Sequence, residues 1–390
     1  MTTITAATVT STAKKVIPRW LGIGTKVTTN TIDEILNEAG LNWTISKRPL
    51  LTVNEIPEKT EKINPRVLGP NGTAKTDALK SRVQELVETN FNESHFGALN
   101  VEVANLISET KDEFIPLQEQ YCIVRDDTKY VFTTVGKLYT CIQNEECLGV
   151  LSNLITDYGL KVECAGTFMN GAAVWVVAAM PETIMVNGES LSQYVRIMWA
   201  HDGTEKLTAR FVYLDDQNHI ISPKIRGAEE EISIRHTKSA HDRTEDAKKI
   251  IARQRKHAEK FVEFASKMGV EHCTTFREYM KEIFPNCDKI IVDEHGYSQE
   301  DSNKDRKTVD QLEVDFSKTK QNFWDAFLTV VDYADTQKST RVHGKTEYTT
   351  ASEEDQMRKE NLLRNNLKSD GTSMKLKQRA WETLTKPIMA

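Results

Sequence analysis

The sequence contains no run of about 18 apolar residues, the length that crosses a bilayer as a helix. Its start, MTTITAATVTSTAKKVIPRW, also lacks the apolar core of a secretory signal. None of the six cysteines stands in a Cys-x-x-Cys pair, and several lie inside apolar runs such as GKLYTCIQNEECLGVL. We therefore expect a cytoplasmic protein without a membrane segment, whose cysteines are reduced, small core residues.

Signatures of several enzyme classes are absent as well. No G-x-S-x-G nucleophile elbow occurs, and the nine histidines form no standard metal-ligand spacing with cysteines or carboxylates. The segment GPNGTAKT, residues 69–76, resembles a P-loop through Lys75 and Thr76, but Ala74 replaces the glycine that lets backbone amides wrap a phosphate. We expect no cofactor, no metal and no catalytic residue, and keep a nucleotide-dependent enzyme as a third alternative.

The chain also lacks an excess of positive charge, because 51 Lys and Arg face 57 Asp and Glu, which gives a net charge of −6. This excludes a uniformly basic surface but not a local one, since nucleic acid responds to the nearby field. Between Arg235 and Lys260 the balance reverses, with nine Lys or Arg against four acidic residues. Lys249, Arg253 and Lys256 recur every three or four residues, so a helix would place them on one side.

Turn and cap residues predict where helices and strands begin and end. Thr31 and Glu34 form a capping box that begins a short helix, which Gly40 ends. From Tyr121 the apolar alternation predicts antiparallel strands. The expected hairpin turns are the dipeptides Asp126-Asp127, Asn170-Gly171 and Asn187-Gly188.

Helical periodicity appears within and after the strands. One helix is expected from Asn144 to Gly159 and a long one from Thr244 to Met268. Three more are expected around 316–334, 353–367 and 373–384. The pattern predicts an α+β fold: an antiparallel meander sheet with packed helices and a helical C-terminal region.

We expect four parts along the chain. They are an N-terminal arm with a short capped helix (1–50), a linker with a helical segment (51–120), the antiparallel α+β core (121–270) and a charged helical C-terminal region (271–390).

The stretch YVRIMWAHDGTEKLTARFVYL contains His201 and Asp202, a possible acid–base pair. Neighbouring side chains on a strand point to opposite faces, so these two would not share a site. Asp202-Gly203 has the composition of a turn, because aspartate bonds the local backbone and glycine permits a positive φ. We therefore expect a hairpin turn here.

Cations on these strands and on the following helix are the expected contacts for the phosphates of single-stranded DNA, because phosphate binding is driven largely by counterion release. The aromatic residues Trp199 and Tyr213 are expected to stack on bases, and His201 to contact a base or a phosphate. The alternative is a solvated helix face, which most charge runs are. The expected phosphate contacts are Arg196, Lys206, Arg210, Lys224, Arg226, Arg235, Lys238, Arg243, Lys249, Arg253 and Lys256.

Several blocks of the sequence together resemble a known family. They are TIDEILNEAGLNWTI, VGKLYTCIQNEECLGVLSNLI, AGTFMNGAAVWVVAAMP, HDGTEKLTARFVY and IRHT. Over roughly residues 20–335 the chain resembles the phage/plasmid-like proteins of the domain of unknown function 932. Where members often carry Cys-Gln-Asn-Thr, this chain has LDDQNHIIS, with Gln217-Asn218 as the remnant.

The resemblance implies a phage- or plasmid-borne protein of the bacterial cytoplasm and brings no catalytic residues with it. Members tend to accompany replication and recombination genes, so proteins of those processes are expected partners. The expected sheet and helix are also similar in outline to Rad52-like single-strand annealing proteins, an analogy of fold. We therefore expect a non-enzymatic, homo-oligomeric single-stranded DNA-binding protein that assists annealing or recombination. The alternative is an interaction factor, for anti-defence or host takeover, that binds a host protein.

Overall fold

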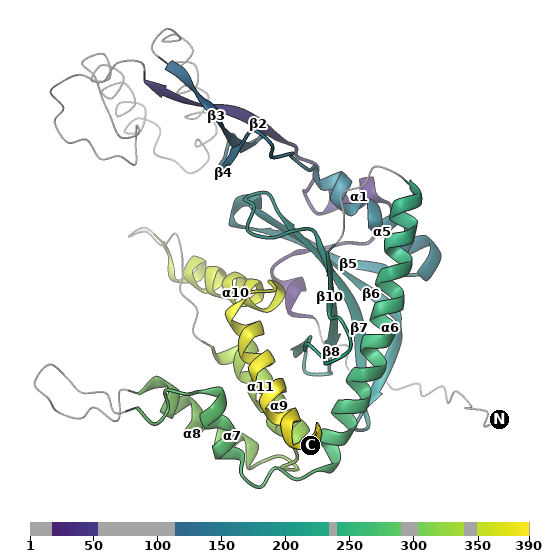
Figure 1. Ribbon diagram of the computed structural model, residues 1–390, viewed down its shortest axis with the longest axis vertical. Helices are drawn as coiled ribbons and strands as arrows, with labels where there is room; N and C mark the ends of the chain where they lie inside the picture. The colour runs from purple at the N-terminus through teal and green to yellow at the C-terminus, as the bar shows by residue number, and fades with distance from the viewer. Residues whose placement is uncertain (1–17, 54–113, 234–239, 290–302, 339–348, 390) are drawn as a thin grey trace, which may run out of the picture.

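The computed structural model describes residues 18–53, 114–233, 240–289, 303–338 and 349–389 (Figure 1). Within these ranges no helix is long and apolar enough to cross a membrane. The P-loop-like segment at 69–76 lies outside them, so the nucleotide-dependent alternative stays a prediction.

The central sheet is antiparallel, and its long strands follow one another along the chain as a meander. The strand order is β1-β5-β6-β7-β8-β10, and β9 pairs with β8. This confirms the predicted α+β class and the meander. The strands are β1 (Thr25–Lys26), β5 (Lys161–Phe168), β6 (Ala173–Val186), β7 (Glu189–Ala200), β8 (Thr208–Leu214), β9 (Ile220–Ile221) and β10 (Glu231–Ser233).

The two Asn-Gly dipeptides form the turns that the sequence predicts. Asn187 and Gly188 join β6 to β7 with φ of 51° and 88°. Asn170 and Gly171 lie between β5 and β6 with φ of 58° and 98°. Asparagine and glycine tolerate this left-handed region better than other residues, which is why they mark tight hairpins.

A second sheet of β2 (Ile45–Val53), β3 (Phe114–Arg125) and β4 (Val131–Gly136) forms an arm that projects from the central sheet (Figure 1). The predicted Asp126-Asp127 hairpin joins β3 to β4. The carboxylate of Asp126 accepts hydrogen bonds from the hydroxyls of Thr44 and Ser46, at 2.8 and 2.6 Å. The turn is therefore held against β2.

Both faces of the central sheet are covered. On one face, Ile197 and Phe211 share a core with Leu148 of α5 (Asn144–Tyr158) and Ile250 of α6 (Ala240–Val270), next to α1 (Ile32–Glu38). On the other face, Met198 packs in a core with residues of η1 (Arg19–Gly22) and α10 (Ala351–Leu367). All seven residues of β8 are consequently buried.

The ends of α1 and α5 refine the predicted caps. Thr31 precedes α1, but its hydroxyl donates to the Glu34 carboxylate at 2.6 Å instead of accepting from the backbone. The residue before α5 that makes the capping box is Gln143, one position earlier than predicted. Asn144 is instead the first residue of the helix, and its buried amide is free to bind other parts of the fold.

The C-terminal helices are α7 (Phe276–Ile283), α8 (Lys304–Phe316), α9 (Phe323–Asp332), the π-helix Tyr333–Gln337, α10 and α11 (Thr372–Met389). The predicted helix at 316–334 is wrong at its start, because Asn322 caps α9 through its side chain and separates it from α8. Phe261 of α6 stacks on Tyr213 of β8, with ring centroids 4.4 Å apart, and on Trp381 of α11 at 5.7 Å. Sheet and C-terminal helices thus share one apolar core.

Candidate nucleic-acid interface

The two strand arginines lie inside the protein. Arg196 and Arg210 are cross-strand partners on β7 and β8, and are 0% and 1% exposed. Both guanidinium groups donate to one oxygen of Glu231 at 2.9 Å, and Arg196 also donates to the Thr208 hydroxyl at 2.9 Å. Ser369, between α10 and α11, donates to the same carboxylate. The prediction that these arginines contact DNA is wrong, because the interior already pairs them with carboxylates.

The charges of this cluster balance one another. Burial alone would raise the pKa of the Glu231 carboxyl, but the neighbouring Arg196 and Arg210 lower it below its ordinary value. Glu205 adds a second carboxylate, 3.7 Å from Arg196 and 3.2 Å from the Ser369 hydroxyl oxygen. The cluster therefore fastens the connection between α10 and α11 to the sheet.

The aromatic residues predicted to stack on bases are also interior. Tyr213 is 0% exposed, and its hydroxyl forms a 2.7 Å hydrogen bond with Nδ1 of His257. Trp199 is 3% exposed and donates its indole N–H to Oδ1 of Asn144 at 3.2 Å. Neither ring lies on an open surface, because the helices cover both faces of the sheet. Stacking on the outside of β7 and β8 is therefore excluded.

His201 and Asp202 have separate roles, as strand alternation predicts. The Asp202 carboxylate accepts from the amide and the hydroxyl of Thr204, at 2.9 and 2.7 Å, and Gly203 has a φ of 77°. These bonds make the segment a turn. His201 is buried against the ring of Phe132, and burial lowers its pKa to about 4. The imidazole is therefore neutral at neutral pH and forms no acid–base pair with Asp202.

Five of the predicted cations lie on two adjacent elements, and we call these five residues the basic face. Lys224 and Arg226 lie in the loop after β9, and Lys249, Arg253 and Lys256 lie on α6; all are exposed except Arg253, which is partly buried. A 2.6 Å ion pair between Arg253 and Glu229 holds the loop against the helix. A hollow of about 380 Å³ between the two elements is lined by Gly227, Ala228, Glu229, Arg253 and Lys256.

Acidic neighbours weaken the basic face only in part. Lys224 lies 3.5 Å from Glu230, and Lys249 lies 3.6 Å from Asp246. Because the lysine of each pair is exposed to solvent, each ion pair contributes about 0–1 kcal/mol, and the lysine can exchange the carboxylate for a phosphate at small cost. For Arg226 and Lys256, the described part of the chain supplies no ion pair.

The remaining predicted contacts are dispersed. Lys206 is exposed in the turn between β7 and β8. Arg243 belongs to α6, but its side chain is outside the described residues, as are Arg235 and Lys238 entirely.

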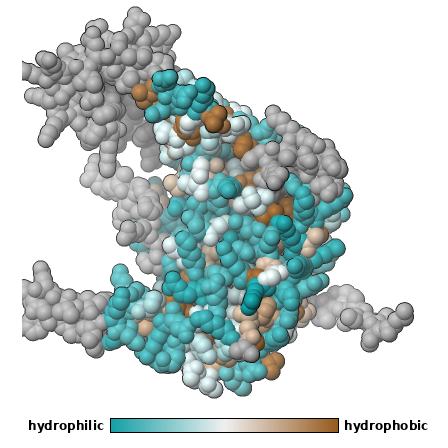
Figure 2. Space-filling view, viewed as in Figure 1, coloured by the Kyte–Doolittle hydropathy of each residue, from teal (hydrophilic) through white to brown (hydrophobic). Residues whose placement is uncertain are grey.

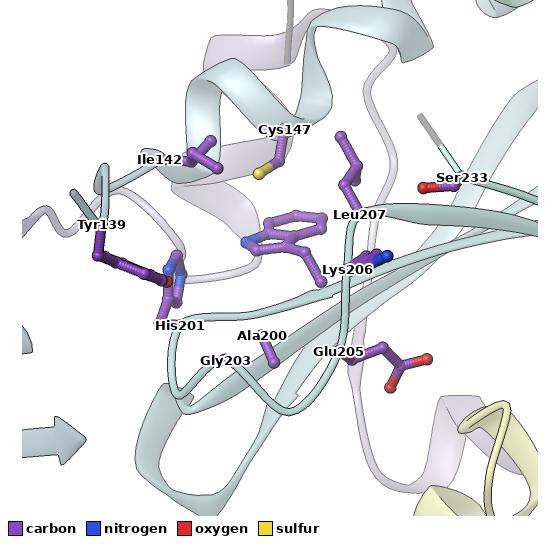
Figure 3. Close-up of a pocket in the computed structure, with 11 residues that line it drawn as sticks. Tyr139, Ile142, Cys147, Ala200, His201, Gly203, Glu205, Lys206, Leu207 and Ser233 are labelled. Atoms are coloured by element: carbon purple, nitrogen blue, oxygen red, sulfur yellow. The ribbon is translucent and has the colours of Figure 1, made fainter. Parts of the chain in front are cut away.

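A cavity of about 270 Å³ lies beside the β7–β8 turn (Figure 3). Figure 3 shows Tyr139 and His201 together at one end of the cavity, with Ile142 and Cys147 above them, and Trp199 is also part of the lining. The remaining lining residues are Ala200, Gly203, Glu205, Lys206, Leu207 and Ser233. The cavity thus combines aromatic and apolar walls with the polar or charged side chains of Tyr139, His201, Glu205, Lys206 and Ser233.

Sequence reasoning missed a buried charged cluster around His219. His219 hydrogen-bonds the carboxylates of Asp215 and Asp332, at 2.5 and 3.2 Å. Burial opposes its charge, but these two bonds raise the pKa of His219 to about 9. Nearby, Lys377 of α11 pairs with Asp335, which also accepts from the backbone amide of Ile220. One feature of the sequence could have predicted this cluster: Asp215 and His219 are four residues apart, inside the stretch that departs from the family pattern.

Among the described residues, no group of three or more His, Cys, Asp or Glu side chains is placed to hold a metal ion. The family model for the domain of unknown function DUF932 matches residues 131–356, more than half of the chain. No curated protein and no solved structure matches the chain. The similarity to Rad52-like annealing proteins therefore stays a prediction.

Proposed function

The chain belongs to the family of the domain of unknown function DUF932, and within that family we propose that it is a single-stranded DNA-binding protein. Its role would be to assist annealing or recombination in the bacterial cytoplasm, beside phage or plasmid replication proteins. The observation that carries the proposal is the basic face: exposed cations lie on a loop and on one side of α6, and the two elements enclose a hollow lined by Arg253 and Lys256. Cations spaced along a groove are what a phosphate backbone requires.

The chemistry near the HDG stretch agrees with a non-enzymatic role. Annealing forms and breaks no covalent bond, so it needs positioning and charge neutralisation rather than an acid and a base. His201 is neutral and forms a hydrogen bond with Asn144, and the Asp202 carboxylate accepts a hydrogen bond from the backbone amide of Thr204 within its own turn. These two residues therefore support the turn and the adjoining cavity.

A salt titration tests DNA binding. Fluorescence anisotropy of a labelled oligonucleotide should give an affinity that falls with salt, with a log–log slope of about −0.7 for each phosphate contact. Alanine at Arg226, Lys249 and Lys256 together should weaken binding at least tenfold, and make the slope about 2 units less steep.

The matched control replaces three exposed lysines of the C-terminal region by alanine, Lys318, Lys359 and Lys386. It changes the net charge equally but leaves the basic face intact, so affinity should stay near that of the unmodified protein. Absence of binding at low salt, or equal losses in both triple variants, would contradict the proposal.

We also propose that the protein acts as a homo-oligomer, because annealing is aided when many copies hold one strand. The support is β4, which forms the edge of the arm: within the described residues it pairs only with β3. Its sequence, VFTTVG, has none of the charges or prolines that protect an edge strand. Apolar residues also gather on this arm in Figure 2.

Strand pairing between copies can be measured by light scattering. Lysine at Thr134, in the middle of β4, should shift the protein from oligomer to monomer, because a charge on an edge strand opposes pairing. Lysine at Thr140, an exposed position after β4, should leave the mass unchanged. An unmodified protein that is monomeric at every concentration would remove this part of the proposal.

A second candidate is binding of a host protein. At the far end of the helical region, Val270 and Met389 are 77% and 46% exposed. A hollow of about 430 Å³ beside them is lined partly by Phe323 and Ile388. Capture of one defined host protein by the full chain, lost in a Val270→Asp variant that still binds DNA, would favour this function.

A further inference from the structure

The cavity beside the β7–β8 turn has no role in the proposed phosphate contacts, yet β10 connects it to the basic face. Ser233 at the end of β10 lines the cavity, and the loop that leads into β10 carries Lys224 and Arg226. The cavity walls come from four different parts of the chain, namely the segment before α5, α5 itself, the end of β7 with its turn, and β10. The loop and the cavity therefore lie at the two ends of one short strand.

Hydrogen bonds around Asn144 fix the proton position on His201. The Asn144 side-chain NH₂ donates to the backbone carbonyl of Leu41 at 2.9 Å, so its Oδ1 is the acceptor. That oxygen accepts the indole N–H of Trp199 at 3.2 Å and lies 2.9 Å from Nε2 of His201. Because an amide oxygen cannot donate, Nε2 of His201 must carry the hydrogen.

The other ring nitrogen of His201 is then an acceptor. A neutral imidazole with hydrogen on Nε2 has a lone pair on Nδ1. Nδ1 has no hydrogen-bond partner within the described part of the chain, although His201 itself is only 3% exposed and lines the cavity. Since burial lowers its pKa to about 4, the lone pair is retained throughout the neutral range.

The walls define what else a ligand must have. The indole of Trp199, with Ile142 and Leu207, offers flat and apolar contact. The Glu205 carboxylate also lines the cavity, and its Oε1 lies 3.7 Å from Arg196 and 3.2 Å from the Ser369 hydroxyl. Lys206 is exposed and supplies a cation at the cavity. The matching ligand is planar, carries an N–H on its edge and has an anionic group attached.

We propose that this cavity binds one nucleobase, with a base N–H donating to Nδ1 of His201 and the attached phosphate lying near Lys206. A volume of about 270 Å³ is just below the usual range of ligand pockets and suits a single base rather than a longer segment. The proposal rests on the proposed function in one respect, because the base belongs to a DNA strand. The same chemistry would also accept a free nucleotide.

The first experiment compares an oligothymidylate with a chain of the same length made only of abasic sites. Tryptophan at Ile142, a half-buried wall residue, should fill the cavity without touching the hydrogen bonds around Asn144. It should weaken oligothymidylate binding about fivefold or more, the loss expected for one stacked base, and leave abasic binding unchanged. The triple alanine variant of the basic face should weaken both.

The second experiment tests the proposed hydrogen bond between the base and His201, first by removing the donor on the base and then by removing the acceptor on the protein. Thymine has one N–H, at N3, so oligomers of N3-methylthymidine keep the ring and lose the donor. They should bind the unmodified protein about fivefold or more weakly than oligothymidylate. A His201→Phe variant, which keeps a ring against Phe132, should bind both oligomers equally. Circular dichroism establishes that each variant is folded.

The outcomes of these experiments distinguish failure of the cavity proposal from failure of the proposed function. If the protein binds no DNA but binds thymidine monophosphate, and Ile142→Trp abolishes that binding, the cavity proposal stands with a free nucleotide as ligand. If DNA binds and folded Ile142→Trp binds it as tightly as the unmodified protein, the cavity proposal is overturned and the basic face is unaffected. Binding of neither DNA nor the nucleotide overturns both.

Discussion

At the scale of single residues, exposure decides what a cation does. Arg196 and Arg210 flank Lys206 in the sequence at distances of ten and four residues, yet the arginines are buried in carboxylate pairs and the lysine is exposed. Arginine suits the interior because its planar guanidinium reaches several acceptors at once. Only the exposed cations can exchange a carboxylate for a phosphate.

Replacement of Arg196 by methionine tests this assignment. It leaves the carboxylates of Glu231 and Glu205 buried with fewer partners, so the free energy of unfolding should fall by about 3–5 kcal/mol. The exposed Lys206→Met control should change it by less than about 0.5 kcal/mol. Urea denaturation followed by circular dichroism measures both. A stable Arg196→Met protein that had lost DNA affinity would show that Arg196 is reached by DNA after all.

At the scale of elements, the two hairpin turns show that backbone conformation and side-chain packing can both require glycine. Gly188 and Gly171 have similar positive φ values, 88° and 98°. An added Cβ at Gly188 would meet nothing within 4 Å, whereas at Gly171 it would lie 2.9 Å from Cζ2 of Trp43. The first turn needs glycine for its backbone alone, and the second also needs it for space.

Alanine substitutions should separate the two effects. Gly188→Ala should lower the free energy of unfolding by about 1–2 kcal/mol, the cost of a left-handed residue with a side chain. Gly171→Ala should cost about 1–3 kcal/mol more, because Trp43 must move. Thermal and urea denaturation of the two variants side by side give the difference. Equal losses would mean that the Trp43 contact relaxes freely.

At the scale of the whole molecule, buried charges join the sheet to the C-terminal helices. His219 follows β8 and bonds Asp332 at the end of α9, while Lys377 of α11 bonds Asp335 and the carbonyl of Ile220 in β9. Breaking such a pair leaves a buried charge, so these contacts resist partial separation. Together with the cluster around Glu231, they hold the C-terminal region against the meander.

The His219 contacts predict how stability depends on pH. The folded pKa of about 9 is higher than the ordinary value of 6.5. The stabilisation is therefore fully present below pH 6.5 and is lost as the pH rises through 9. It amounts to about 3 kcal/mol at most, since each pKa unit corresponds to about 1.4 kcal/mol.

Urea denaturation at pH 6, 7.5 and 9 follows this loss. In a His219→Asn variant the decline between pH 6.5 and 9 should be much smaller, whatever its absolute stability. Parallel curves for the two proteins would show that His219 is not the titrating group.

The sequence by itself determined most of the local structure. The Asn-Gly turns, the strand alternation, the Asp202-Gly203 turn and the long helix at α6 were all predictable, because each depends on neighbouring residues. The position of α5 was predicted to within one residue, since Gln143 and Asn144 are both able to cap. The start of α9 was missed because a cap at Asn322 interrupts an otherwise apolar pattern.

Only the tertiary structure decided which residues can meet a ligand. The alternation of side chains along β7 and β8 predicts which residues share a face of the sheet. It does not reveal that both faces of the sheet are covered by other elements. That coverage buries Arg196, Arg210 and Tyr213, and leaves the loop and α6 to carry the exposed cations. The cavity at Trp199 and His201 likewise exists only because distant segments meet there. Local interactions set the elements of this protein, and long-range packing set which side chains remain accessible.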